Sequence, residues 1–135
     1  MPKCTTVAIA GCGSRGYGAY SIHAKQMPDR MKIVAAADLI PERLERMAKE
    51  YDLPREMCFS SAEEMLKQDK LADVLFVCVQ DRDHVRLAVE GIKKGYDILL
   101  EKPISPDLYE CAQIVKVAKE YHKAVTVCHV LRYTP

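Results

Sequence analysis

The sequence lacks an excess of charge of either sign, and it lacks any long apolar segment. Its 135 residues carry 20 Lys and Arg against 19 Asp and Glu, which gives a formal net charge of +1. That balance gives no reason to expect nucleic acid or an anionic membrane as a partner. No segment approaches the ~20 apolar residues that cross a bilayer, and the apolar residues 7–10 are too few for a secretory signal. We therefore predict a cytoplasmic protein with no membrane or nucleic-acid partner.

The six cysteines lack the spacings of a metal site or a disulfide framework. The sequence holds no Cys-x-x-Cys pair and no histidine spacing typical of zinc. Several cysteines lie within apolar runs, as Cys78 does between Val77 and Val79, where a thiol packs like a small hydrophobic group. We predict six reduced cysteines in the core and no metal.

Apolar runs alternate with helical patterns along the chain. Five nearly continuous runs predict strands at residues 6–10, 32–37, 73–79, 97–100 and 124–128, and a weaker strand is expected at 57–59. Continuous runs are typical of parallel strands that helices cover on both faces. The predicted fold class is therefore α/β, a doubly wound parallel sheet of about six strands, with residues 1–135 as one domain.

Helix start signals separate these strands. Pro41 stands where a first helical turn tolerates proline, and Ser61 with Glu64 fits a capping box. Residues 105–107 open a further helix. We predict that one apolar face of this helix carries Leu108, Cys111, Ala112, Val115 and Ala118.

Residues 11–16, Gly-Cys-Gly-Ser-Arg-Gly, directly follow the first strand and open a helix. In such a turn Gly11 permits the tight bend, Gly13 lets backbone approach a pyrophosphate, and Gly16 lets helix and strand pack closely. The helix N-terminus would offer free N–H groups to the phosphates. Arg15 would stack on adenine or pair with a phosphate.

Asp38 ends the second strand about 20 residues after Gly16, the spacing of the acidic residue that meets the adenosine ribose. A carboxylate there accepts the ribose hydroxyls of NAD and repels the 2′-phosphate of NADP. NAD is therefore the favoured cofactor, with NADP as the alternative. Two other interpretations stay open: the glycines and Asp38 form only turns and a helix cap, or the cleft holds a methyl-donor or flavin nucleotide.

Charged groups follow three of the predicted strands, at the sheet edge where ligands of open parallel sheets bind. Lys102 is either a desolvated lysine that exchanges protons beside a nicotinamide or a surface lysine paired with Glu101. His84 either starts a helix and bonds to backbone or belongs to the site. His129 and Arg132 are candidate substrate contacts, and Arg132 would clamp a phosphate or carboxylate or brace the end of the chain.

Taken together, the sequence resembles the glucose–fructose oxidoreductase / inositol dehydrogenase / MocA-like family. The matching segments are residues 10–16, 37–38, 80–84, 95–103 and 129–135, of which Glu-Lys-Pro at 101–103 is the most specific. The resemblance implies a Rossmann fold and covers the N-terminal NAD(P)-binding domain of that family. The family's C-terminal α+β domain, which binds substrate and forms the homo-oligomer interface, is absent from residues 1–135, so we expect the chain alone to be inactive.

The resemblance also implies roles for individual residues. Lys102 would assist proton transfer to or from a sugar-like substrate, and the Lys102–Pro103 bond is often cis in such proteins. Gln80 and His84 would flank the nicotinamide-side ribose, although Gln80 and Asp81 replace a Thr-Pro pair that is common there. The full set of expected cofactor contacts is Gly11, Cys12, Gly13, Ser14, Arg15, Gly16, Asp38, Val79, Gln80, His84, Glu101 and Lys102.

We predict an NAD(P)-dependent oxidoreductase that transfers hydride between nicotinamide and a secondary alcohol carbon of a sugar, inositol or related polyol. The alternative enzyme is an NAD-using glycosidase, in which transient oxidation of one ring carbon permits elimination of the leaving group. A third, non-catalytic possibility is an NAD(P)-sensing module.

Overall fold

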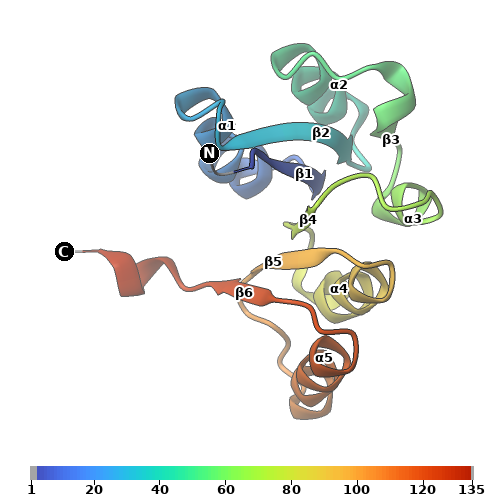
Figure 1. Cartoon of the computed structure of the whole chain (residues 1–135), viewed down its shortest axis with the longest axis vertical. Coiled ribbons are helices and arrows are strands. Elements are labelled where there is room, and N and C mark those ends of the chain that lie inside the picture. Colours follow the sequence, from blue (N-terminus) through green and yellow to red (C-terminus); the bar gives the residue numbers. More distant parts are fainter. Residues whose placement is uncertain (1–2, 135) are drawn as a thin grey trace.

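A computed structural model describes residues 3–134 and contains six parallel strands in one sheet, in the order β3-β2-β1-β4-β5-β6 (Figure 1). Every neighbouring pair in the sheet is parallel. The predicted fold class and strand number are confirmed. The strands are β1 (Thr5–Ala10), β2 (Met31–Ala37), β3 (Cys58–Phe59), β4 (Val74–Val77), β5 (Asp97–Glu101) and β6 (Val125–Cys128).

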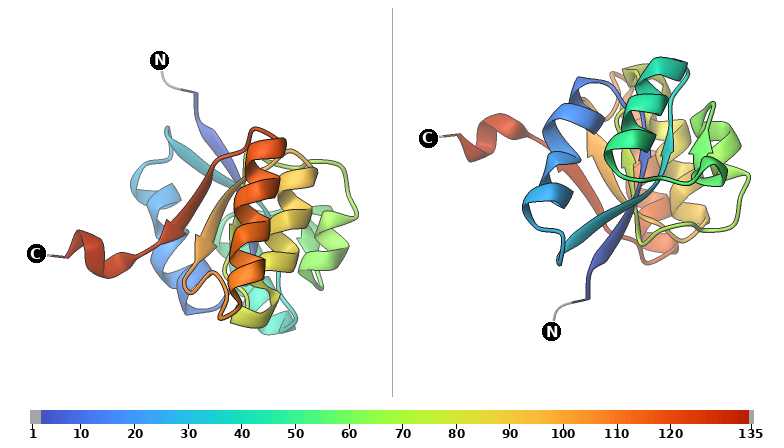
Figure 2. Two further views of the ribbon diagram at one scale, coloured as in Figure 1. Left: turned by 90° about the horizontal axis from the view of Figure 1, so that it is seen from below. Right: turned by 90° about the horizontal axis from the view of Figure 1, so that it is seen from above.

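Helices connect the strands and cover both faces of the sheet. Figure 2 shows α4 and α5 over one face and α1 and α2 over the other. Two helices have the start signals that the sequence predicts, with Pro41 in the first turn of α2 and the Ser61 side chain accepting a hydrogen bond from the Glu64 N–H at the start of α3. The helical segments are η1 (Ser14–Tyr20, π-helical), α1 (Ile22–Gln26), α2 (Pro41–Glu50), η2 (Arg55–Met57), α3 (Ala62–Leu66), η3 (Asp81–Asp83), α4 (His84–Lys93), α5 (Leu108–Glu120) and η4 (Val130–Tyr133).

Two apolar clusters fill the space between the sheet and its helices. Successive residues of β1 face opposite sides, so Ala8 and Ala10 belong to the cluster under α3, α4 and α5. Val7 and Ile9 belong to the second cluster, under η1, α1 and α2. Because both faces of β1 are covered, its central residues are all buried, which is why the strand reads as an unbroken apolar run.

The predicted apolar face of α5 is wrong at Leu108, Ala112 and Val115, whereas Cys111 and Ala118 are half-buried. Leu108 is 82% exposed and Val115 is 54% exposed, whereas Ile114 and Val117 are buried against the sheet and α4. Apolar residues occur on more than one side of this helix, so the sequence pattern alone did not define the side that packs. The Asp107 side chain caps the helix by accepting hydrogen bonds from the N–H groups of the first turn.

The cysteines are all free thiols, but only Cys12 and Cys128 are buried. Cys78 is half-buried and packs against the second cluster, and the other three are also partly exposed, which corrects the prediction that all six lie in the core. Residues 3–134 contain no group of three side chains arranged to hold a metal ion. Within the same residues, no helix has the length and apolar character needed to cross a membrane.

Candidate dinucleotide-binding site

The glycine turn after β1 is held by two close backbone approaches. Gly11 has a φ of 95°, and a Cβ there would lie 2.4 Å from the carbonyl oxygen of Cys78. A Cβ on Gly16 would lie 1.9 Å from the carbonyl oxygen of Gly11. Neither position accepts a side chain, so both glycines are required by the fold itself.

Gly13 differs from these two glycines. The nearest atom to a Cβ at this position is an Arg43 guanidinium nitrogen at 3.5 Å, and no backbone lies within van der Waals contact. The protein therefore has room for a methyl group at Gly13, and that room faces the cleft. A bound pyrophosphate would occupy the space that a Cβ would fill, which is the fit expected of a dinucleotide.

Asp38 follows β2 and fixes the turn from the side. Its Oδ2 accepts a hydrogen bond of 2.6 Å from the Cys12 N–H, and its Oδ1 accepts one of 2.8 Å from the Ile40 N–H. The carboxylate is 9% exposed and borders the cleft. Each oxygen keeps a further lone pair, so a carboxylate fixed in this way can also accept ribose hydroxyl groups.

The thiol of Cys12 takes no part in this site. The residue is fully buried, its Sγ lies 3.6 Å from the carbonyl oxygen of Ala37, and burial with the neighbouring Asp38 carboxylate raises its pKa to about 12. Only the backbone N–H of Cys12 contributes, through Asp38. If Cys12 contacts the cofactor, as the sequence predicts, it does so through its main chain and not through its thiol.

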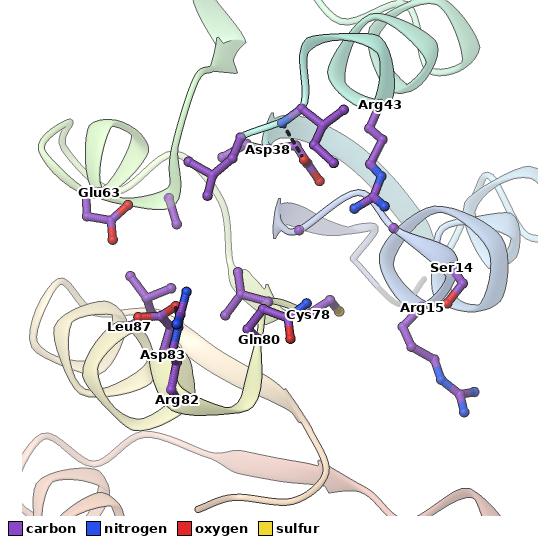
Figure 3. A pocket seen from close by; sticks show the side chains of 17 residues that line it. Ser14, Arg15, Asp38, Arg43, Glu63, Cys78, Gln80, Arg82, Asp83 and Leu87 are labelled. Atoms are coloured by element: carbon purple, nitrogen blue, oxygen red, sulfur yellow. Dashed lines mark hydrogen bonds and ion pairs between the residues drawn. The ribbon is translucent and has the colours of Figure 1, made fainter.

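A cleft of about 430 Å³ opens beside the turn, within the range of small-molecule sites. It lies where the sheet order reverses between β1 and β4, the position at which doubly wound sheets bind ligands. Figure 3 shows Arg43 directed onto the glycine turn and Arg15 directed away from Asp38. The lining residues are Gly11, Gly13, Ser14, Arg15, Ala37, Asp38, Leu39, Ile40, Arg43, Ala62, Glu63, Cys78, Val79, Gln80, Arg82, Asp83 and Leu87.

Two charged residues of this lining, Arg43 and Glu63, were missed in the sequence, whereas Arg82 and Asp83 belong to the charged segment 80–84 that was expected at this edge of the sheet. Arg43 had a usable signal, because Pro41 marks the start of a helix whose first turn must lie beside the end of β2. Glu63 comes from α3, and its approach to the cleft depends on how that helix packs. The first N–H groups of a helix have no intrahelical partner. Within the described residues no side chain caps the helix that follows the turn, so no capping side chain occupies these groups.

Glu101, at the end of β5, is a buried carboxylate on the other side of the turn. It is 6% exposed, its Oε2 accepts a 3.2 Å hydrogen bond from the Lys102 N–H, and its Oε1 accepts one from the Tyr20 hydroxyl. Arg15 places its Nε 3.9 Å from the same oxygen. Arg15 thus faces Glu101, on the side of the turn away from Asp38, which favours a role toward the phosphates over adenine stacking.

Lys102 is exposed, which agrees with the second of its two interpretations, a surface lysine, and not with a desolvated one. The chain leaves the sheet directly after Glu101, which carries the following residue out of the core. The Lys102–Pro103 peptide is cis, as the resemblance implies.

His84 is fully buried at the start of α4. Its Nδ1 lies 2.6 Å from the carbonyl oxygen of Pro103 and its Nε2 lies 3.1 Å from that of Val79. The ring therefore bonds to backbone, the first of the two interpretations considered for it, and it ties the loop after β4 to the segment after β5. His129 and Arg132 are exposed and lie in the segment after β6, which projects away from the sheet (Figure 1), so the structure does not bring them to the cleft.

A strand, a glycine turn, a helix and an acidic residue at the next strand end define a dinucleotide-binding domain of the Rossmann type. Comparison with known proteins identifies the family to which this domain belongs. Residues 5–129 match the model of the oxidoreductase family with an NAD-binding Rossmann fold, GFO_IDH_MocA, and the chain belongs to that family. NAD is therefore the cofactor of this domain.

Two curated relatives and one solved structure illustrate the family. An inositol 2-dehydrogenase from Corynebacterium glutamicum is 25% identical over 137 residues, covering 100% of this chain and 39% of its own length. A glycosyl hydrolase family 109 protein from Bacteroides fragilis is 26% identical over 130 residues, covering 90% of this chain and 28% of its own. The WlbA dehydrogenase from Bordetella pertussis, solved with NADH and UDP-GlcNAcA, has a TM-score of 0.81 and 25% identity, covering 92% of this chain and 36% of its own. The chain thus spans less than two-fifths of these proteins.

Proposed function

We propose that this chain is the cofactor-binding part of an enzyme that transfers hydride between NAD and a secondary alcohol carbon of a sugar, inositol or related polyol. The observation that carries the proposal is the open space at Gly13 beside the fixed carboxylate of Asp38, which together suit a pyrophosphate and its adenosine ribose. The substrate class is supported by the relatives, whose names include an inositol dehydrogenase and a dehydrogenase solved with a nucleotide sugar.

The proposed roles of the residues are cofactor binding and proton transfer. The first-turn N–H groups after Gly13 would bind the pyrophosphate, and Asp38 would accept the adenosine ribose hydroxyls. Bound NAD supplies the hydride acceptor. Lys102, exposed beyond the end of β5, would give a proton to or take one from the substrate oxygen. Val79 and Gln80, at the cleft wall, would flank the nicotinamide-side ribose.

An NAD-using glycosidase is the second candidate. It is favoured by the match to a glycosyl hydrolase family 109 protein over 90% of this chain. Such an enzyme needs the same cofactor site, because it oxidises one ring carbon transiently and then reduces it again.

The cofactor role is tested by titrating the chain with NADH and following nicotinamide fluorescence. We expect a saturable change, and its absence would contradict the proposed site. The two reactions separate when polyols and aryl glycosides are each incubated with NAD and an intact protein that contains this chain, since the chain alone is expected to be inactive. Polyol-dependent formation of NADH supports the dehydrogenase, whereas glycoside cleavage that requires NAD without its net reduction supports the glycosidase.

A further inference from the structure

Tyr20 connects the helix of the glycine turn to the end of β5. It is the last residue of η1, and its ring packs edge-on against Phe76 of β4, with ring centroids 6.1 Å apart at 86°. Its hydroxyl donates a hydrogen bond to Oε1 of Glu101, which lies 81 positions away in the sequence. The helix that begins at the phosphate-binding turn is thereby joined to the end of β5.

The carboxylate that receives this hydrogen bond has few other partners. Glu101 is 6% exposed, so water has little access to replace a lost donor. Its second oxygen accepts from the Lys102 N–H at 3.2 Å, and Arg15 is a more distant neighbour at 3.9 Å. The orientation of the Glu101 carboxylate is therefore set mainly by the Tyr20 hydroxyl on one side and the Lys102 backbone on the other.

We propose that Tyr20 is a positioning residue, which orients Glu101 through its hydroxyl and thereby fixes the backbone from which Lys102 extends. The other side of this backbone is fixed by the 2.6 Å contact between His84 Nδ1 and the Pro103 carbonyl oxygen. Lys102 thus stands between two anchors, and only the Tyr20–Glu101 anchor belongs to the helix of the glycine turn. The expected effect of this position of Lys102 on binding of the nicotinamide rests on the proposed function.

The protonation state of Tyr20 agrees with this role. Burial, together with the adjacent Cys128 thiol and Glu101 carboxylate, raises the pKa of the Tyr20 hydroxyl well above its ordinary value. The hydroxyl therefore keeps its proton at neutral pH, and it remains a hydrogen-bond donor to the carboxylate.

The test compares Tyr20→Phe with a matched loss of a different tyrosine hydroxyl. Tyr20→Phe keeps the ring against Phe76 and removes only the donor. Tyr96→Phe removes a hydroxyl that accepts a 2.8 Å hydrogen bond from the Leu71 N–H, near the start of β5 and away from Glu101. Both variants lose one tyrosine hydrogen bond, so a general loss of stability affects both.

Two measurements are made on the full chain. In 1H–15N spectra, the Lys102 amide signal should move in Tyr20→Phe and stay in place in Tyr96→Phe, because its N–H bonds to Glu101. In titrations, Tyr20→Phe should weaken binding of NADH by about three- to tenfold. Its affinity for ADP-ribose, which lacks the nicotinamide, should stay within about twofold of the wild type.

An unmoved Lys102 amide in Tyr20→Phe overturns the proposal, and so does an equal loss of affinity for NADH and ADP-ribose. If Tyr20→Phe fails to fold, Glu101→Gln is the substitute variant. A glutamine side chain has one acceptor oxygen, so it cannot accept hydrogen bonds from the Tyr20 hydroxyl and the Lys102 N–H with two oxygens as the carboxylate does. The Lys102 N–H signal should therefore move in this variant as well. If the wild type binds neither nucleotide, the proposed function fails, while the Lys102 amide still decides whether Tyr20 positions the strand end.

Discussion

The three glycines of the turn do different things, and single substitutions separate them. An alanine at Gly13 meets only the end of a flexible arginine, whereas an alanine at Gly16 would collide with the Gly11 carbonyl oxygen. We expect Gly13→Ala to leave the melting temperature almost unchanged and to weaken NAD binding by about tenfold or more, which is about 1.4 kcal/mol. Gly16→Ala should lower the melting temperature strongly. Thermal unfolding and NADH titration measure the two effects.

Gly18→Ala is the control for this series, because no atom lies within 4 Å of a Cβ at that position. It should change neither stability nor binding by more than a small helix-propensity effect. Wild-type affinity for NADH in Gly13→Ala would show that the pyrophosphate does not bind against this turn.

Asp38 carries a second prediction, on the choice between NAD and NADP. Its charge lies beside Cys12 and Ile40 at the ribose end of the cleft, and Arg43 is the nearby cation that can pair with a 2′-phosphate. We expect Asp38→Ser to narrow the preference for NAD over NADP, and the further change Arg43→Ala to weaken NADP more than NAD. Parallel titrations with both reduced nucleotides measure this, and an unchanged preference in Asp38→Ser would contradict the role of its charge.

The sequence predicted residues whose role is local better than residues whose role depends on distant contacts. The positions of Gly11, Gly16 and Asp38 follow from a turn between adjacent elements, and the structure places them as expected. For Lys102 the sequence left two interpretations open, and the structure shows the exposed one. The neighbouring Glu101 accepts its hydrogen bond from Tyr20, which lies 81 positions earlier. No local pattern reports such a contact.

At the scale of elements, Asp73 joins the beginnings of β1 and β4. Its Oδ2 accepts hydrogen bonds from the Thr6 N–H and the Thr6 hydroxyl at 3.0 and 2.9 Å, and Lys3 lies 3.2 Å from its other oxygen. These donors, the Thr6 backbone first, lower the pKa of Asp73 from its ordinary value of 3.8 to about 2. A carboxyl whose pKa is lowered by folding stabilises the protein above the unfolded-state value and stops doing so as the pH falls toward the folded-state value.

We therefore expect wild type to exceed Asp73→Asn in melting temperature above about pH 4, with the difference disappearing as the pH falls toward about 2. Thermal unfolding over a pH series measures this difference. Asp69→Asn is the control, because among the described residues no hydrogen bond holds that exposed side chain. A difference that stays constant down to pH 2 would mean that the Thr6 contacts do not depend on the carboxylate charge.

A second prediction at the scale of elements concerns which side of α5 is buried. Ile114 is 3% exposed, so Ile114→Ala should lower the free energy of unfolding by about 2–5 kcal/mol. Leu108 is 82% exposed, and Leu108→Ala should stay within about 0.5 kcal/mol of the wild type. Urea unfolding measures both. Equal effects would mean that the helix is rotated toward the side that the sequence pattern favoured.

The error at α5 has a physical source. Apolar residues lie on more than one side of the helix, and only the position of the sheet and of α4 selects Ile114 and Val117 as the packed pair. The start of the helix was predictable, because Asp107 acts on N–H groups two and three residues away. Caps depend on neighbours in the chain, whereas the choice of a packed face depends on the tertiary fold.

At the scale of the whole molecule, the cleft is bordered by segments from both halves of the sheet. The glycine turn and Asp38 come from β1 and β2, while Val79 and Gln80 follow β4. Each of the two apolar clusters, on opposite faces of the sheet, contains residues of all three strands. A dinucleotide across the switch point therefore contacts elements that are distant in the sequence. Binding to the folded state alone shifts the unfolding equilibrium of the entire domain.

This gives the last prediction, for the stability of the domain as a unit. NADH at about 100 times its dissociation constant should add about 2.7 kcal/mol to the free energy of unfolding, which raises the melting temperature by about 10 °C. Differential scanning fluorimetry over a series of NADH concentrations measures the rise, which should keep growing with the logarithm of the concentration. In Gly13→Ala the melting temperature without nucleotide should match the wild type, and the rise should need a higher NADH concentration. An identical rise in both proteins would mean that the nucleotide does not bind against the glycine turn at Gly13.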